Sequence, residues 1–399
     1  MDANESIISQ LLVEFQDFKS DRSISNEDLF SKLGDTKSIF RWSGQFPGRL
    51  AGIFLDKYSK SGDTILDPFA GSGTVLFEAA KRSLECVGID INYAAIILSE
   101  TAIFCNMNLE LRKEYLKKLY IIIKKIIDAF DKQTKNGNKF TTNDYSRIKN
   151  RLDAIKDPNM RNLLLNVLMR MSISEEKYTT TGLIKSFQIH SKIIEELPYS
   201  SKSCRIFNSD ARAIPLKNKS INLIITSPPY PGVFDYYKNY KKIMYLVGRS
   251  ISETSKKEIG HSRGTGNKFL ELINYAKDMN KALLEMIRVL KEDGRLILIV
   301  NHESEIKNVK FLNSGLLYTL AAASGLQMIL KQERYLKNRH GDELQEDILH
   351  FIPSRSKFKT SDNYSTDAVV YFLENAIPSS DIQSRKLLKE ALSSLLNSS

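Results

Sequence analysis

A short apolar run that ends in two consecutive prolines places the strongest constraint on how this chain folds. Residues 221–225 have the length and β-branched content of a strand that is buried on both faces. Pro228 and Pro229 have no N–H to donate, so the chain must leave the sheet at Ser227 in a stiff, extended turn. Such a turn lies at the carboxyl end of a buried strand, which is where open α/β sheets bind ligands.

The same turn carries groups that suit a flat ligand with an amino group. The Ser227 hydroxyl and the Pro228 carbonyl can both accept hydrogen bonds, and Tyr230 places an aromatic face beside them. A nucleobase could stack on that ring and direct its exocyclic amine to the two acceptors. The alternative is an ordinary turn at the end of a strand, because short motifs recur by chance.

A second strand, at residues 64–67, leads into a glycine-rich turn and then an amphipathic helix. Gly71 and Gly73 allow the backbone to approach a ligand closely. The turn lacks the Gly-Lys-Ser/Thr of a nucleoside triphosphate loop, and Leu76 replaces the third glycine of a dinucleotide loop. The carboxylate of Asp67 therefore indicates a ligand with a positive amino group rather than one with phosphates.

A third strand, at residues 85–90, ends in Asp90. An acidic residue about 20 positions after such a glycine loop typically holds the two hydroxyls of a ribose. The alternative is that Asp90 only caps the helix that begins near Tyr93, since aspartate is common at helix starts. Asp210 stands at another strand end, and the aromatic segment at residues 40–50 is a candidate ligand wall.

Composition indicates the kind of partner. The chain of 399 residues has a formal net charge of +11 and a pI near 9.2, which favours an anionic partner, nucleic acid first and acidic membrane second. We expect a cytoplasmic protein, because no apolar run approaches the roughly 20 residues of a membrane span and the N-terminus is no secretory signal. Cys86, Cys105 and Cys204 are scattered, so we expect buried thiols and neither disulfides nor a metal site.

The order of strand and helix patterns predicts one alternating sheet with helical additions. The last two strand patterns, at residues 326–335 and 347–353, are so close that they must form an antiparallel hairpin. A glycine turn is expected at Gly294, before a strand at residues 295–301. Helices are expected at 109–131, 144–155, 161–171, 182–197, 269–290, 312–323, 367–377 and 383–396.

Basic residues gather in two segments. Residues 111–160 hold 13 Lys or Arg against 6 Asp or Glu, a net charge of +7. Their lysine pairs recur seven positions apart and so share a helix face, which is either a solvated surface or a contact for phosphates. The second segment follows Tyr230 and interleaves tyrosines with lysines, a mixture suited to stacking on bases. It ends in a glycine-rich loop at residues 260–266 that could close on a substrate.

In these residues the chain resembles the S-adenosylmethionine-dependent amino-methyltransferases of DNA. Asp67-Pro-Phe-Ala-Gly-Ser-Gly-Thr resembles the cofactor motif of that family, Thr226-Ser-Pro-Pro-Tyr its catalytic motif, and Gln45-Phe-Pro-Gly-Arg-Leu the segment before the cofactor motif. The resemblance implies an α/β, Rossmann-like class I methyltransferase fold. Its sheet is mostly parallel and seven-stranded, with a C-terminal antiparallel hairpin strand and a large helical insertion.

We therefore predict four parts. Residues 1–37 form a helical lead-in, and residues 38–105 with 203–353 form the methyltransferase domain. Residues 106–202 form the helical insertion, which is unusual for the family and is a candidate DNA contact, and residues 354–399 form C-terminal helices.

The resemblance also implies S-adenosyl-L-methionine as the cofactor and double-stranded DNA as the partner. Asp67 would hold the methionine amino group, while Asp90 and Asp210 fall where the family holds ribose and adenine. The expected cofactor-binding residues are Phe46, Asp67, Pro68, Phe69, Gly71, Gly73, Thr74, Asp90, Ile91, Asp210 and Ala211. The expected catalytic residues are Ser227, Pro228, Pro229 and Tyr230. The expected DNA contacts are Lys117, Lys118, Lys124, Lys125, Tyr236, Tyr237, Lys238, Lys241 and Arg263.

A serine at the start of the catalytic motif favours methylation of the exocyclic N4 amine of cytosine, whereas members with aspartate there more often modify adenine. Methylation of the cytosine ring carbon needs a cysteine nucleophile, usually after a proline, and the chain has no Pro-Cys. The expected function is site-specific methylation of a flipped-out cytosine in a restriction-modification or phage-defence system, together with a restriction endonuclease or defence proteins. The alternatives are adenine N6 in DNA, guanine N2 in RNA, and a non-catalytic nucleic-acid-binding protein.

Overall fold

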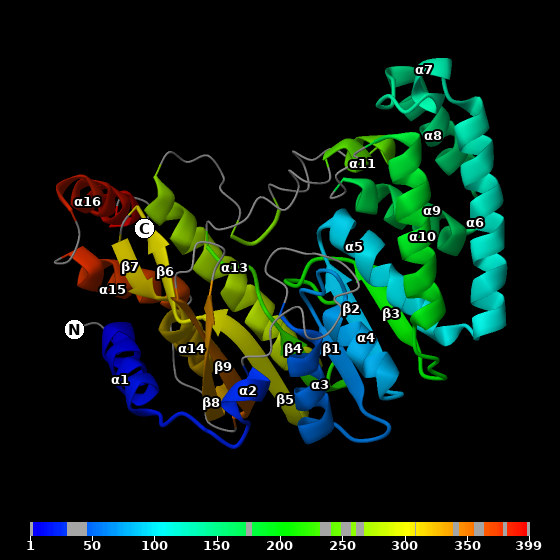
Figure 1. The fold of residues 1–399 in the computed structure, drawn as a ribbon. Helices are drawn as coiled ribbons and strands as arrows, with labels where there is room; N and C mark the ends of the chain where they lie inside the picture. The colour runs from blue at the N-terminus through cyan, green and yellow to red at the C-terminus, as the bar shows by residue number, and fades with distance from the viewer. Residues whose placement is uncertain are drawn as a thin grey trace.

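A seven-stranded sheet forms the centre of the molecule (Figure 1). The computed structural model describes residues 3–29, 46–172, 178–231, 241–248, 257–260, 267–307, 309–337, 343–354, 363–377 and 381–396. The strands are β1 (Thr64–Asp67), β2 (Glu85–Asp90), β3 (Cys204–Asn208), β4 (Ile221–Thr226), β5 (Leu290–Asn301), β8 (Leu326–Lys337) and β9 (Glu343–Pro353).

The order and direction of the strands determine the fold class. The strands lie side by side as β3-β2-β1-β4-β5-β9-β8, and β1 to β5 pair in parallel. Strand β9 inserts between β5 and β8 and runs antiparallel to both. The order reverses between β1 and β4, so a ligand crevice is expected at their carboxyl ends. This is the predicted Rossmann-like class I methyltransferase fold, and the prediction is confirmed.

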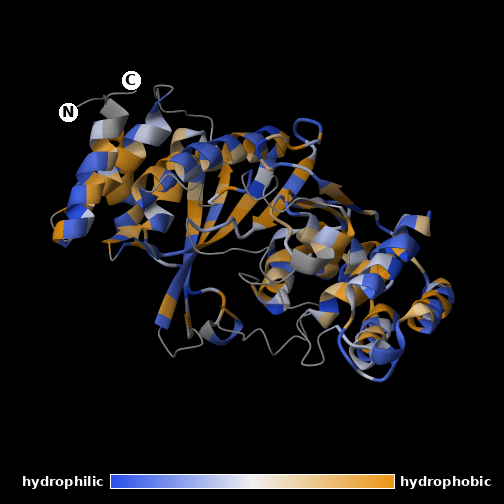
Figure 2. Cartoon of the chain, turned by 90° about the horizontal axis from the view of Figure 1, so that it is seen from above, coloured by the Kyte–Doolittle hydropathy of each residue, from blue (hydrophilic) through white to orange (hydrophobic). Residues whose placement is uncertain are grey.

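The sheet separates two hydrophobic layers because successive strand residues point to opposite faces. Ile65 and Leu223 pack into the core on one face, whereas Leu66 and Ile224 pack into the core on the other. The first layer is covered by α3 (Gly48–Tyr58), α4 (Thr74–Lys81), α5 (Tyr93–Ser99) and the insertion. The second is covered by α1 (Ala3–Asp17), α13 (Lys268–Val289), α14 (Asn313–Ala323) and α15 (Tyr364–Ala376). Seen from above, the strands are mostly hydrophobic and the helices carry both kinds of residue (Figure 2).

The helical insertion stands beside the β3 edge of the sheet (Figure 1). It follows η1 (Glu100–Asn106) and comprises α6 (Leu109–Ala129), α7 (Lys132–Lys135), α8 (Thr142–Ala154), α9 (Pro158–Met171) and α10 (Thr180–Glu196). The buried side chains of Asn162 and Asn166 on α9 both donate to the carbonyl oxygen of Ile97, at 2.9 and 2.8 Å. Leu163 belongs to the same hydrophobic cluster as Leu98 of α5. The insertion therefore shares the core of the sheet.

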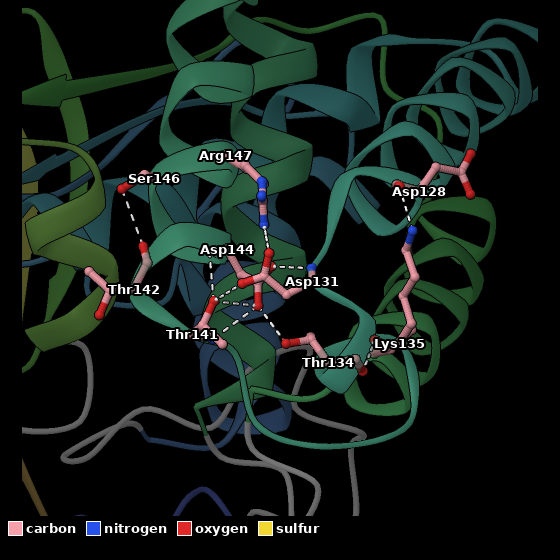
Figure 3. Close-up of polar contacts among 10 residues, drawn as sticks. Asp128, Asp131, Thr134, Lys135, Thr141, Thr142, Asp144, Ser146 and Arg147 are labelled. Atoms are coloured by element: carbon pink, nitrogen blue, oxygen red, sulfur yellow. Dashed lines mark hydrogen bonds and ion pairs between the residues drawn. The ribbon is translucent and has the colours of Figure 1, made fainter.

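Asp144 organises the far end of the insertion (Figure 3). Its buried carboxylate accepts hydrogen bonds from the Thr134 hydroxyl at 2.5 Å, the Thr141 backbone N–H at 2.9 Å and the Asp131 backbone N–H at 3.0 Å. Arg147 is ion-paired with both Asp131 and Asp144. Burial by itself raises the pKa of Asp144, but these hydrogen bonds outweigh it and lower the pKa. The cluster joins α6, α7 and α8 and has a structural role.

Three features differ from the sequence predictions. Strand β5 begins at Leu290, and Gly294 lies within it, where the pairing with β4 shifts register between Ile221 and Leu223. A two-stranded hairpin, β6 (Glu303–Ile306) and β7 (Val309–Leu312), had no prediction because β6 alternates only over four residues and carries two glutamates. The one-turn helix α7 was too short to leave a periodic pattern.

The remaining helices are α2 (Asn26–Leu29), α11 (Lys241–Leu246) and α16 (Ile382–Leu396). Cys86, Cys105 and Cys204 are all buried free thiols, as predicted, and burial raises the pKa of Cys105 to about 12. No helix in the described part of the chain combines the length and apolarity needed to cross a bilayer.

Candidate active site

Asp67 ends β1 and lies inside the protein, with 2% of its surface exposed. One carboxylate oxygen accepts from the backbone N–H of Phe69 at 3.1 Å and from the Thr226 hydroxyl at 2.7 Å. Burial raises the pKa of Asp67 to about 7, although both hydrogen bonds oppose the rise. Thr226 is the last residue of β4, so this hydrogen bond connects the ends of two neighbouring strands.

The turn after Asp67 needs its glycines. Gly71 and Gly73 have φ angles of +52° and +86°, in the left-handed region that other residues rarely adopt. A Cβ atom on Gly73 would lie 3.0 Å from the Cα atom of Ser99. Gly73 is the N-cap of α4, which begins at Thr74, so the start of that helix adjoins the glycine turn. The backbone here can contact a ligand closely.

Asp90 joins the glycine turn to the end of β2. Its carboxylate accepts from the backbone N–H of Gly71 at 2.9 Å and of Asn92 at 2.8 Å. Burial raises the pKa of Asp90 to about 6 in spite of these hydrogen bonds. Helix α5 is capped by the Asn92 side chain, which accepts from Ala94 at 2.9 Å. The alternative that Asp90 serves only as the helix cap is therefore wrong.

These two carboxylates fit a cationic, hydroxyl-bearing ligand. Among the residues that the structure describes, neither Asp67 nor Asp90 forms an ion pair with a lysine or arginine. Their raised pKa values reflect negative charge that is buried without compensation. A phosphate would add more negative charge, whereas an ammonium group would offset it and hydroxyls could donate to the carboxylates. The two carboxylates therefore suit the amino group and the ribose hydroxyls of S-adenosyl-L-methionine.

Asp210 differs from these two carboxylates because it is paired. Arg212 approaches it at 2.6 Å, contacts Asp278 on α13 at 2.8 Å, and donates to the carbonyl oxygen of Lys257 at 2.7 Å. Ala211 beside them is buried. Arg212 and Asp278 were missed from the sequence, because nothing local indicates that α13 packs on the loop after β3.

The hydrophobic members of the predicted site lie on different sides of the sheet. Phe46 is buried in the core layer of α3, whereas the partly exposed Phe69 packs against the layer of α13. Pro68 is buried, and Ile91 lies next to Asp90, where its carbonyl oxygen accepts from Asn208 at 3.1 Å. Phe69 therefore has more surface available to a ligand than Phe46.

The double-proline turn follows β4 directly. Pro228 is buried, Pro229 and Ser227 are partly exposed, and Tyr230 has 9% of its surface exposed. The Ser227 and Tyr230 hydroxyls are 3.2 Å apart. Gly260 packs against the turn, since a Cβ atom there would lie 2.8 Å from the Tyr230 carbonyl oxygen. Because the Thr226 hydroxyl donates to Asp67, the predicted catalytic and cofactor segments meet at the carboxyl ends of β1 and β4.

Two residues of the β8–β9 hairpin are linked to this turn by hydrogen bonds and were not predicted. The Tyr230 hydroxyl donates to Glu346 on β9 at 3.3 Å, and Glu346 accepts from Arg334 on β8 at 2.7 Å. Glu346 is paired in the ladder with Asn301, the last residue of β5, so it lies at the same edge of the sheet. Only the strand order reveals this, because Glu346 is 116 residues from Tyr230.

The predicted DNA contacts separate into those on the insertion and those after the catalytic turn. Lys117, Lys118, Lys124 and Lys125 are all exposed on α6. Lys118 pairs with Glu114 at 2.6 Å, and Lys124 lies 5.6 Å from the ring centre of Tyr120. Tyr236, Tyr237, Lys238 and Arg263 lie outside the described residues.

Lys241 begins α11, a helix that follows the double-proline turn in sequence and packs against the insertion. Met244 and Leu246 of α11 are buried in the same hydrophobic cluster as the insertion, and α11 contacts α8 and α9. Helix α11 therefore packs on the insertion (Figure 1).

Comparison with known proteins finds similarity to DNA methylases. The family model described as DNA methylase matches residues 14–100, which include the Asp67 motif and Asp90. The Type II methyltransferase M.MjaII of Methanocaldococcus jannaschii is 22% identical over 416 residues, covering 73% of this chain and 77% of that protein. The Type II methyltransferase M.BsoBI of Geobacillus stearothermophilus is 23% identical, covering 59% of this chain and 58% of that protein.

Solved structures are less similar. A SAM-dependent methyltransferase from Methanosarcina mazei aligns over 76% of this chain and 98% of its own, with 12% identity and a TM-score of 0.35. Similarity this low adds nothing to the fold assignment, which rests on the strand order.

Proposed function

Because the chain belongs to the S-adenosylmethionine-dependent DNA amino-methyltransferases, we propose that it methylates the exocyclic N4 amine of a cytosine flipped out of duplex DNA. The family has DNA as its substrate and S-adenosyl-L-methionine as its cofactor. The choice of cytosine rests on one observation: the acceptor at the start of the catalytic turn is the neutral hydroxyl of Ser227, one residue from the Thr226–Asp67 hydrogen bond.

The cofactor site is proposed to use Asp67 and Asp90, the two buried carboxylates that have no ion pair with the residues that the structure describes. Asp67 would hold the methionine amino group and Asp90 the ribose hydroxyls, while Asp210 and Ala211 would lie beside the adenine. Gly71, Gly73 and Thr74 would provide close backbone contact, and Phe69 with Phe46 and Pro68 would line the site. When bound, the cofactor supplies an activated methyl group.

The chemistry at the target base depends on acceptors. An exocyclic amine is a poor nucleophile because its lone pair is delocalised into the ring. The Ser227 hydroxyl and the Pro228 carbonyl would draw its hydrogens out of the ring plane and so localise the lone pair for attack on the methyl group. Pro229 holds this turn rigid, and Tyr230 would stack on the flipped base. The N–C bond would form as the bond between the methyl group and the cofactor sulfur breaks, S-adenosylhomocysteine would leave with the bonding electron pair, and the methylated amine would lose one proton to water. No covalent intermediate with the protein is needed.

DNA contact is proposed to involve the insertion together with residues 231–266. The packing of α11 on α8 and α9 supports this pairing, and the four exposed lysines of α6 provide positive charge. The proposed contacts after the turn are Tyr236, Tyr237, Lys238, Lys241 and Arg263. A role in restriction-modification or phage defence, with a restriction endonuclease or defence proteins as partners, belongs to the same proposal.

Transfer of labelled methyl groups to DNA tests the function. Purified protein is incubated with genomic DNA and labelled S-adenosyl-L-methionine, and the nucleosides are identified by mass spectrometry after digestion. N4-methylcytosine is the expected product. N6-methyladenine would replace the proposal by the adenine alternative, and N2-methylguanine from added RNA would move the enzyme to RNA. No transfer to any nucleic acid would favour a binding protein without activity.

Charge reversal tests the DNA surface. We expect K117E/K118E and K124E/K125E each to weaken DNA binding and to reduce the slope of log affinity against log salt by about 2, because each pair would no longer neutralise about two phosphates. The matched control is K386E/K389E on α16, which changes two exposed lysines at the other end of the molecule (Figure 1). Unchanged binding by both insertion variants would remove the insertion from this role.

A further inference from the structure

A chain of hydrogen bonds connects the proposed catalytic serine with a buried ion pair on two distant strands. The Ser227 and Tyr230 hydroxyls are 3.2 Å apart, and the Tyr230 hydroxyl is 3.3 Å from Oε1 of Glu346. Oε2 of Glu346 accepts from Nε of Arg334 at 2.7 Å and also from Nη2 of Arg334. The four residues come from the turn after β4 and from the hairpin β8–β9.

The outer end of this chain is fixed by charge and burial. The Arg334 side chain is 2% exposed and the Glu346 side chain 12% exposed. A guanidinium can only donate hydrogen bonds, so the carboxylate that faces it must accept. Neither side chain can turn away without leaving a buried charge unpaired, which is strongly unfavourable. Glu346 therefore presents a fixed acceptor to Tyr230.

A fixed acceptor determines the direction of every other bond in the chain. A phenol has one proton, and Tyr230 donates it to Glu346. The phenol oxygen can then only accept from Ser227, so the serine must donate its own proton to Tyr230. The lone pairs of the serine oxygen remain for another group. An amine that must be held by acceptors needs this orientation, since the reverse one would turn the serine proton toward the hydrogens of the amine.

We infer that Glu346, held by Arg334, is a positioning residue that sets the direction of the Ser227–Tyr230 hydrogen bond and so makes Ser227 an acceptor for the substrate amine. This inference rests on the proposed function, because it assigns a role to Ser227 in amine methylation. It adds two residues, from strands far from the catalytic motif in sequence, that no known motif of the chain contains.

The substitution E346Q should reverse the direction of the hydrogen bonds that join position 346, Tyr230 and Ser227. The amide oxygen is attracted to the Arg334 guanidinium, so the amide NH2 faces Tyr230 and donates to the phenol oxygen. Tyr230 must then donate to Ser227, and the serine proton faces the base. We expect kcat to fall by about tenfold to a hundredfold, while KM for DNA and for S-adenosyl-L-methionine stays within about twofold. The matched control is E343Q, which makes the same change at an exposed position of β9.

Tyr230→Phe provides a second variant that keeps the ring and leaves the ion pair intact. Without the phenol oxygen Ser227 loses its acceptor, so kcat should fall by a similar factor. In the Y230F background, E346Q should have no further effect on kcat. Wild-type kcat in either single variant, or additive losses in the double variant, would overturn the inference. If E346Q does not fold, Y230F alone still decides, because wild-type kcat in that variant removes the role of the chain.

A readout without catalysis separates this inference from the proposed function. With 13C at the Cζ position of tyrosine, the Tyr230 resonance can be assigned by its absence in Y230F. It should move upfield in E346Q, because the phenol no longer donates to a carboxylate, and stay in place in E343Q. If the unaltered protein transferred no methyl group, the proposed function would fail. The shift of the Tyr230 resonance would still test the direction of the hydrogen bonds. An unmoved resonance in E346Q would overturn the inference whatever the activity.

Discussion

The two sides of the site hold buried carboxylates in opposite ways. Asp67 and Asp90 are held by backbone N–H groups and a threonine hydroxyl, and burial raises their pKa values to about 7 and 6. Glu346 is instead paired with a buried arginine. A carboxylate whose charge is not compensated attracts a cationic ligand, whereas one that is already paired can only orient its neighbours. We propose that the first kind binds the cofactor, whereas Glu346 contacts the double-proline turn through Tyr230.

The environments of Asp67 and Glu346 also differ in electrostatic free energy. A rise of the pKa of Asp67 from 3.8 to about 7 corresponds to about 4 kcal/mol in favour of the protonated carboxyl group. We propose that the ammonium group of the cofactor offsets this cost when it binds beside Asp67. Glu346 is instead ion-paired with Arg334. Variants on the two sides should therefore change different measured quantities.

The largest effect is expected from Ser227→Ala, which removes a proposed acceptor for the amine. Methyl transfer should slow by about 10²- to 10³-fold, since loss of one positioned hydrogen-bonding group has this cost in comparable sites. Cofactor affinity should not change. Single-turnover transfer and calorimetric titration measure the two quantities. The control is Ser220→Ala, a serine just before the other end of β4, and equal losses in both variants would argue against a catalytic role.

Asp67→Asn should change cofactor affinity rather than the rate of methyl transfer. We expect the Kd for S-adenosyl-L-methionine to rise by about tenfold to a hundredfold, because the amide cannot attract the ammonium group as a carboxylate does. The rate at saturating cofactor should change much less. The control is Asp63→Asn, another buried aspartate, just before the start of β1, whose carboxylate accepts from Lys60 at 2.9 Å. Unchanged affinity in D67N would place the amino group elsewhere.

Cofactor binding should depend on pH through Asp67. Below pH 7 the carboxyl group is mostly protonated in the free protein, so binding of the ammonium group must release a proton. The affinity should rise by up to about tenfold between pH 6 and pH 8 and then level off. Calorimetry in buffers of different ionisation enthalpy should detect the released proton in the wild type and not in D67N. An affinity independent of pH would contradict the assignment.

The stability of the protein without cofactor should also depend on pH through Asp67. It should fall as the pH rises, whereas cofactor affinity should increase. The folded pKa of Asp67 lies above its unfolded value, so this carboxyl group contributes most to stability below about pH 4. Its contribution is lost as the pH rises toward 7. The Tm of D67N relative to the wild type should therefore increase between pH 5 and pH 8. A constant difference over this range would show that Asp67 ionises normally.

The smallest effect is expected where the two sides meet. Thr226→Val keeps the volume of a fully buried side chain but removes the hydroxyl that donates to Asp67 at 2.7 Å. The pKa of Asp67 should rise further, and cofactor affinity at pH 7 should fall by about two- to tenfold. The rise of affinity with pH should move to higher pH. Thr319→Val, at a buried threonine of α14, is the control.

How much the sequence could predict depends on whether a feature is local. Asp67 and Asp90 end buried strands and Ser227 directly follows one, and a glycine or proline lies within two residues of each, so a few neighbouring residues sufficed to predict their places. Glu346 and Arg334 lie on strands whose patterns were recognised, but their contact with Tyr230 depends on β9 lying beside β5. Arg212 and Asp278 were missed for the same reason. A single sequence contains no signal for such pairings.

Our central proposal is that Asp67 and Asp90 hold the methyl donor beside the double-proline turn. A crystal structure of the protein with S-adenosyl-L-methionine tests it most directly. We expect the amino group of the donor against Asp67, the ribose hydroxyls against Asp90, and the methyl group directed toward Ser227 and Pro228. A donor bound with its amino group away from Asp67, or with its methyl group remote from Ser227, would contradict the account.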